Sequence, residues 1–262
     1  MNIFKFIFVF IFMALNFLSL TVEAKPLQAN VSKQGELGRH RIVDANTNLP
    51  IKGAKVTLPK NSFSTVTNED GVFDLRADIS GETLMSIEKS GYKPFSLTVN
   101  ERIAARPMIV GIEKTGPMDI VVDTGIFHLG DNNYSDMSAN ASEFKVKSIG
   151  PYYTKNVKID YAGNNTYLVI GSILGIDTKL AKSMGQNRIS FAYASPTEVF
   201  FNGNKIAEID LNGDGQKIKL PRQLIRQNQE NEITIKTGRN LMQNDYIDYD
   251  DIEIMNLYIE SR

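Results

Sequence analysis

The 262-residue chain contains no cysteine and no tryptophan, and its 29 basic and 30 acidic side chains nearly cancel. Without cysteine the chain has no disulfide, no thiol nucleophile and no thiol to carry a lipid anchor. The balanced charge gives no basic patch of the kind that binds nucleic acid or an anionic membrane. Stability must therefore come from core packing, with or without the help of a bound cation.

The first 24 residues have the pattern of a cleaved export signal. Lys5 precedes the apolar run FIFVFIFMALNFLSL, and Val22-Glu23-Ala24 fits the small-x-small rule for signal peptidase. The run is shorter than the about 20 apolar residues that a membrane-spanning helix needs. We therefore predict cleavage of residues 1–24 and a secreted or periplasmic mature chain that is not inserted in the membrane. An uncleaved anchor is the alternative.

Between residues 38 and 114, seven short strand-like segments alternate with turns rich in Gly, Asn, Asp and Pro. Such punctuation is typical of all-β proteins, and seven strands in a segment of this length predict a Greek-key sandwich. Asp70-Gly71 supplies a turn residue that accepts a positive φ. The segments are HRIVDA, AKVTL, FSTVT, VFDL, TLMSIEK, FSLTV and MIVGIEK.

GRHRIVDANTNLPIKGAKVTL, followed by STVTNEDGVFDL and LMSIEKSGYKPFSLTV, resembles the carboxypeptidase regulatory-like domain, a prealbumin-type sandwich of seven strands. The resemblance implies that the matching residues build the fold and carry no chemistry of their own. We assign residues 25–115 to this domain. The matching residues are Asp44, Thr47, Pro50, Ile51, Gly53, Ala54, Val56, Thr67, Asp70, Gly71, Phe73, Gly91 and Tyr92.

The second half, residues 116–262, also has the pattern of short strands. EKTGPMDIVVDTGIF is the expected join, because Gly116-Pro117 breaks the preceding strand. Asn202-Gly203 predicts a hairpin, and GIDTKLAKSMGQ predicts the one helix or long loop. Eight or nine strands predict a jelly roll. The strands are expected at EFKVKS, VKIDY, TYLVIGSI, RISFAYA, TEVFF, KIAEIDL, QKIKLP, NEITIKTG and DIEIMNLYIE.

VFFNGNKIAEIDLNGDGQKIKLPRQLI and the later NEITIKTGRN resemble the galactose-binding-like jelly roll in the order of strand, Asn-Gly hairpin, Pro-led loop and strand. The resemblance implies a module that binds carbohydrate or another surface. The expected fold class is therefore all-β, with a seven-stranded Greek-key sandwich followed by a jelly-roll β-sandwich.

Catalytic motifs are missing from the sequence. The two histidines, His40 and His128, lie in different halves, and neither a zinc motif nor a G-x-S-x-G elbow occurs. DLNGDG opens like a calcium-binding loop, but the twelfth residue of that loop is Pro221, which has no carboxylate. We interpret DLNGDG as a hairpin turn and predict that the protein is not an enzyme.

An acidic cluster, NDYIDYDD, precedes the last strand. Asp250 and Asp251, with Asp131 as a partner, are the predicted ligands of a structural calcium ion, since hard oxygen ligands suit that ion. The alternatives are a solvated acidic edge that discourages aggregation and a catalytic carboxylate pair.

The apolar residues of that last strand change parity. Ile252 and Ile254 share one face, whereas Leu257 and Ile259 take the other. The strand therefore either contains a bulge or is buried on both faces.

The predicted function is that of an exported, non-catalytic protein that binds carbohydrate or a cell-envelope surface through its C-terminal half. Sugar binding uses exposed aromatic rings, and Tyr152 and Tyr153 follow Gly150-Pro151 in a predicted loop. These two tyrosines and His128 are the predicted ligand contacts. The alternative is a structural or protein-interaction accessory module, and a hydrolase is a third hypothesis.

Overall fold

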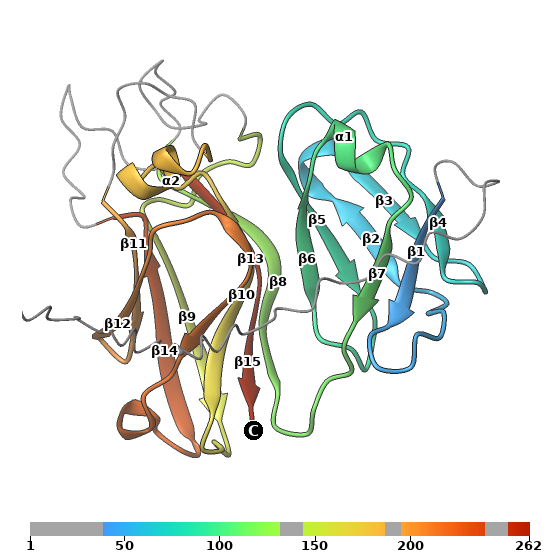
Figure 1. Cartoon of the computed structure of the whole chain (residues 1–262). Helices are drawn as coiled ribbons and strands as arrows, with labels where there is room; N and C mark the ends of the chain where they lie inside the picture. Colours follow the sequence, from blue (N-terminus) through green and yellow to red (C-terminus); the bar gives the residue numbers. More distant parts are fainter. Residues whose placement is uncertain (1–38, 132–143, 187–194, 239–250) are drawn as a thin grey trace, which may run out of the picture. The chain divides into compact units, whose positions relative to one another are not determined.

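The structure is a computed structural model that describes residues 39–131, 144–186, 195–238 and 251–262. The described chain is almost entirely strands and turns, which confirms the all-β fold class (Figure 1). Residues 34–262 form one compact unit. The predicted export signal lies outside the described residues, and among those described no helix is long and apolar enough to cross a membrane.

The N-terminal sandwich has the seven predicted strands in two sheets, β4-β1-β7 and β3-β2-β5-β6. Strands β1 and β7 pair in parallel, and the other pairs are antiparallel. A 3₁₀ turn and a short helix, α1, join the strands and were not expected from the sequence. The elements are β1 Arg39–Asp44, β2 Lys55–Leu58, η1 Pro59–Asn61, β3 Phe63–Val66, β4 Val72–Asp74, β5 Thr83–Glu88, β6 Phe95–Val99, α1 Glu101–Ala104 and β7 Ile109–Ile112.

Residues that carry the family resemblance hold the turns of this sandwich. Asp44 Oδ1 accepts hydrogen bonds from the backbone N–H groups of Asn46 and Thr47, and the Tyr92 hydroxyl donates to Asp44 Oδ2. Gly71 has a φ of +70°, and a Cβ there would lie 2.4 Å from the Ile42 carbonyl oxygen. Only glycine fits that position without displacing the first strand.

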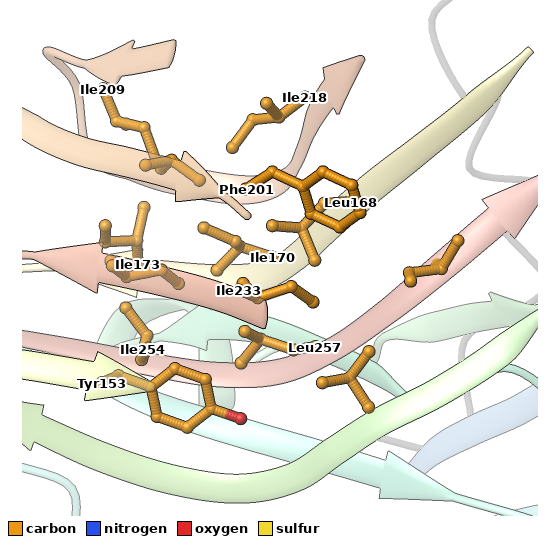
Figure 2. Close-up of a cluster of buried hydrophobic side chains, with 14 of the residues drawn as sticks. Tyr153, Leu168, Ile170, Ile173, Phe201, Ile209, Ile218, Ile233, Ile254 and Leu257 are labelled. Atoms are coloured by element: carbon orange, nitrogen blue, oxygen red, sulfur yellow. The ribbon is translucent and has the colours of Figure 1, made fainter. Parts of the chain in front are cut away.

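The C-terminal sandwich consists of two four-stranded antiparallel sheets, β13-β10-β15-β8 and β12-β11-β14-β9. Apolar side chains from both sheets fill the space between them (Figure 2). The elements are β8 Ile120–Leu129, β9 Tyr152–Ile159, β10 Thr166–Leu174, α2 Lys179–Ser183, β11 Thr197–Phe201, β12 Asn204–Ile209, β13 Gly213–Lys219, η3 Arg222–Leu224, β14 Gln229–Lys236 and β15 Ile252–Ser261.

Several local predictions are confirmed in this half. Asn202 and Gly203 have φ angles of 51° and 77° and form the hairpin between β11 and β12. The expected helix is α2, where the Thr178 side chain accepts a hydrogen bond from the Ala181 N–H. The RISFAYA segment lies outside the described residues.

Three predictions are wrong. Of the expected strand EFKVKS, the described residues 144–148 are irregular, and Ser148 forms an isolated bridge with His128. Most of the expected join is strand β8. It pairs with β15 and forms one edge of the sheet β13-β10-β15-β8. DLNGDG is not a hairpin turn, since β12 and β13 belong to different sheets and the segment crosses between them.

Strand β15 both contains a bulge and is buried on both faces, the two possibilities that the parity of its apolar residues left open. Ile252, Ile254, Leu257 and Ile259 all belong to the core cluster, and the register shifts at Asn256, which has a φ of 58°. The residues on its other face are also buried or nearly so. The strand is therefore bulged and buried on both faces.

The bulge continues into the neighbouring strands. The pairing register places Gly171 of β10 opposite both Asn256 of β15 and Gly215 of β13. A Cβ on Gly171 would lie 2.5 Å from Ser96 Oγ of the N-terminal sandwich. Glycine at this position therefore permits close approach of the two sandwiches.

We predict that residues 25–115 fold when produced alone. The buried cluster of this region contains only residues from Ile42 to Ile112, so the fragment retains its complete core. Amide exchange should show protected strands β1, β2 and β5 in the isolated fragment. Random-coil chemical shifts would instead mean that the two halves share a core and that the boundary at residue 115 is misplaced.

Candidate functional site

The loop-bearing end of the C-terminal sandwich brings together the predicted site residues. The pairing register places Leu129 beside Ile252 and Leu174 beside Glu253 in one sheet. The connections from β8 to β9, β10 to β11 and β14 to β15 all leave from this end, and they contain residues 132–143, 187–194 and 239–250, which lie outside the described residues.

Tyr152 and Tyr153 point to opposite sides of β9, as alternation along a strand requires. Tyr152 is 47% exposed on the outer face of its sheet. Tyr153 is buried in the core, packs on Phe127 and donates a hydrogen bond to Asp123 Oδ2 (3.2 Å). Burial and the neighbouring Asp123 raise the pKa of Tyr153. The prediction of Tyr153 as a ligand contact is corrected, because its ring is not accessible.

Tyr152 belongs to a cluster on the outer face, which we call the tyrosine–lysine platform: Tyr152, Glu198, Phe200 and Lys236. Cross-strand pairing puts Lys236 between Glu198 and Tyr152. Lys236 Nζ lies 5.9 Å from the centre of the Tyr152 ring, 5.2 Å from that of the half-buried Phe200 ring and 3.6 Å from Glu198 Oε2. Glu198 is only 6% exposed and is paired with Lys236, so the platform combines the Tyr152 and Phe200 rings with a cation that Glu198 holds in place from below.

The sequence analysis did not identify three members of the platform as candidate site residues: Phe200, Lys236 and Glu198. The signal was present, since Val199 and Phe201 are apolar neighbours that point inward and so force Glu198 and Phe200 outward. The proximity of Lys236 could not be found in this way, because it depends on the register between β11 and β14.

His128 is fully buried, so the prediction that it contacts a ligand is also corrected. Its Nδ1 lies 2.7 Å from the Val146 carbonyl oxygen and its Nε2 lies 2.7 Å from Asp251 Oδ1. Because a carbonyl oxygen can only accept, Nδ1 carries a proton. Burial lowers the pKa of His128, but the bonds to Asp251 and Val146 outweigh it and the net shift is upward.

Asp251 is fully buried as well, which contradicts the interpretation of this residue as part of a solvated edge. A buried carboxylate also cannot contact a substrate as a catalytic group. Its Oδ1 accepts from His128 and from the Asp131 N–H (3.1 Å), so the structure brings two of the predicted calcium ligands together. Burial raises the pKa of Asp251, and the bond to His128 opposes that rise. Asp250 lies outside the described residues.

Among the described residues, no group of three or more His, Asp or Glu side chains could hold a metal ion. Calcium therefore stays a prediction for Asp250, Asp251 and Asp131, of which the structure describes Asp251 and Asp131. The loop that resembles a calcium site makes other contacts: Asn212 Oδ1 accepts from the Ile176 N–H, and Asp214 bonds to Thr98.

Asp177 is a further buried carboxylate at this end, and it was not singled out from the sequence. Within the part of the chain that the structure describes, neither of its oxygens has a hydrogen-bond partner. Burial raises the pKa of Asp177 to about 7, although Lys182 opposes this. Because burial without a hydrogen-bond partner disfavours the charged form, the Asp177 carboxyl group is partly protonated near neutral pH.

Comparison with protein families identifies the first half. Residues 41–117 match the CarboxypepD_reg-like domain, as the turn residues around Asp44 and Gly71 led us to expect. Residues 41–117 form a CarboxypepD_reg-like domain. The match ends there, so the galactose-binding-like resemblance of the second half stays a prediction. The comparison with curated proteins finds no match.

Two solved structures align with most of the chain at low similarity. A glycoside hydrolase, BuGH86, in complex with neoagarooctaose aligns over 83% of this chain and 28% of its own, with 9% identity and a TM-score of 0.30. A DUF3823 family protein from Bacteroides ovatus ATCC 8483 aligns over 85% of this chain and 98% of its own, with 9% identity and a TM-score of 0.23. This chain thus spans less than a third of the hydrolase, and such TM-scores carry no argument about function.

The Asp177→Asn variant is expected to be more stable than the parent protein at pH 8. The pKa of Asp177 rises on folding from 3.8 to about 7, so its contribution to stability is lost as the pH rises through that range. The substitution should remove a penalty on the order of a few kcal/mol at pH 8 and change little at pH 4. Urea unfolding at both pH values measures it, with the exposed Asp160→Asn as control. Equal pH dependence in Asp177→Asn and the parent would contradict the assignment.

If Asp131 and Asp251 hold calcium, a chelator should lower the melting temperature. An ion that binds only the folded state contributes about 2.7 kcal/mol when it is a hundredfold above its Kd, and each kcal/mol corresponds to roughly 2–8 °C. Asp251→Asn also removes the negative charge that His128 Nε2 contacts, so its stability alone is not informative. The decisive measurement is whether the chelator shift of the parent disappears in that variant. A melt insensitive to chelator would leave the His128–Asp251 pair as purely structural.

Proposed function

We propose that the chain is an exported binding protein that recognises carbohydrate, or another hydroxyl-rich surface of the cell envelope, through its C-terminal sandwich. The observation that carries the proposal is the exposed Tyr152 ring beside the partly exposed Lys236, which the buried Glu198 holds in place. Aromatic rings stack on the C–H faces of sugars, while fixed charged groups bind their hydroxyls.

The positive and negative charges at and beside the platform nearly cancel, which favours an uncharged ligand. Lys205 pairs with Glu198 (3.3 Å) and with Glu208 (2.8 Å), and Lys236 also pairs with Glu198. Two lysines therefore face two glutamates, and this arrangement gives little attraction for a polyanion.

A binding role also agrees with the absence of an identified catalytic family. The sequence offers no nucleophile motif, and the domain that is identified, at residues 41–117, is of a regulatory-like type. Asp251, the carboxylate suggested for catalysis, is buried against His128.

Loss of the Tyr152 ring is expected to weaken glycan binding about tenfold. Stacked pairs of aromatic rings contribute about 0.5–1.5 kcal/mol beyond the area they bury. We take a sugar stacked on Tyr152 to contribute a similar amount, and 1.4 kcal/mol is a tenfold change in Kd. A glycan array should first find a ligand for the mature chain, and calorimetry should then compare Tyr152→Ala with the parent.

Tyr161→Ala is the matched control, since Tyr161 is 61% exposed and follows the opposite end of β9. It should bind as the parent does. Equal loss in both variants would contradict the platform as the site. No retention on any glycan at sub-millimolar concentration would contradict carbohydrate binding and favour a protein-interaction accessory module.

A further inference from the structure

The outward face of strand β15 carries carboxylates that are buried by the N-terminal sandwich. Lys60, in the 3₁₀ turn after β2, places its Nζ 3.3 Å from Glu253 Oε2. The two side chains are only 4% and 0% exposed. A buried ion pair of this kind is sensitive to the loss of either partner, because the remaining charge is then desolvated without full compensation.

A second lysine of the N-terminal sandwich repeats the arrangement at the other end of β15. Lys93 Nζ lies 3.6 Å from both Asp119 and Glu260, and 2.9 Å from Glu113. Burial lowers the pKa of Lys93, but the surrounding carboxylates outweigh it and the net shift is upward. Lys93 is therefore charged at neutral pH and balances the acidic residues around it.

Polar contacts fill the space between these two ion pairs. Asn256 Nδ2 donates to Ser86 Oγ (3.0 Å), and the Thr98 N–H donates to both carboxylate oxygens of Asp214 (3.1 and 3.0 Å). One small apolar cluster, Leu84 with Leu174 and Met255, also joins the two sandwiches. Orientation between them is thus fixed by specific partners rather than by a large apolar surface.

Lys60 also reaches the loop-bearing end. Its Nζ lies 5.2 Å from the centre of the Phe144 ring, which in turn packs 4.9 Å from the His128 ring. His128 bonds to Asp251. A cation from the N-terminal sandwich therefore lies over Phe144, which packs on the His128 of the buried His128–Asp251 pair.

We propose that the N-terminal sandwich serves as the built-in folding partner of the C-terminal sandwich, with Lys60 as the positioning residue. Lys60 places a positive charge beside the buried Glu253 of β15, and it packs over Phe144, which contacts His128 at the loop-bearing end. The proposal does not depend on which ligand the platform binds.

The test is amide hydrogen exchange on the full mature chain carrying Lys60→Met, which keeps an unbranched side chain of similar shape and removes its charge. Exchange should accelerate by roughly tenfold or more in β10 and β15, although the substitution lies in the other sandwich. Strands β1, β4 and β7 should exchange as in the parent. Lys52→Met is the control, since the Lys52–Glu69 pair is exposed (66% and 78%) and should leave all strands unchanged.

A second variant keeps the proposal falsifiable if Lys60→Met does not fold. Glu253→Gln removes the buried charge, so the chain that carries both Lys60→Met and Glu253→Gln should fold and show protected β15 amides, and a double variant that also fails to fold would overturn the proposal. Acceleration confined to residues 39–112, or strictly additive effects of the two substitutions, would overturn the proposal.

Discussion

Strand β15 is buried on both faces, because one face packs into the core of its sandwich and the other meets the N-terminal sandwich. The first face packs four side chains into the core: Ile252, Ile254, Leu257 and Ile259. Glu253 and Glu260 lie on the second and depend on cations from Lys60, Lys93 and neighbouring basic residues. A polar group can stay in such a place only if it is partnered, so double burial dictates the charges around the strand.

The same constraint explains the backbone irregularities. Apolar residues can face the core on both sides of Asn256 only if one extra residue is inserted, and Asn256 takes that place with a positive φ. Gly171 and Gly215 stand at the same level in the adjacent strands. The bulge turns the Asn256 side chain towards Ser86, so the irregularity also supplies a contact between the two sandwiches.

The sheet that contains β15 is covered on both faces, by the core on one side and by the N-terminal sandwich on the other. The candidate binding surface therefore lies on the other sheet of the C-terminal sandwich. The outer face of β12-β11-β14-β9 carries exposed polar residues together with the exposed Tyr152 and the half-buried Phe200. Nothing in the described part of the N-terminal sandwich hydrogen-bonds to this face. Buried His128 and Asp251 then organise the loop-bearing end from within, while the platform faces solvent.

The sequence by itself determined the fold class, the seven strands of the first sandwich, the hairpin at Asn202-Gly203 and the change of parity in β15. These features depend on local periodicity, turn chemistry and the φ preferences of single residues, all of which are written in neighbouring positions. Tyr152 and Tyr153 were expected in a loop, whereas strand β9 begins at Tyr152 and turns the two rings to opposite faces. The strand in 120–129 was missed because an edge strand next to a Gly-Pro break resembles a linker.

Only the tertiary structure decided which carboxylates are buried and what they meet. Asp251 and His128 are 123 positions apart, and Lys60 and Glu253 come from different sandwiches. Such pairs depend on strand register and on the docking of one sheet against another, which no local pattern encodes. For that reason the acidic cluster looked like a solvated edge or a calcium site in the sequence, whereas in the folded protein Asp251 is the buried partner of a histidine.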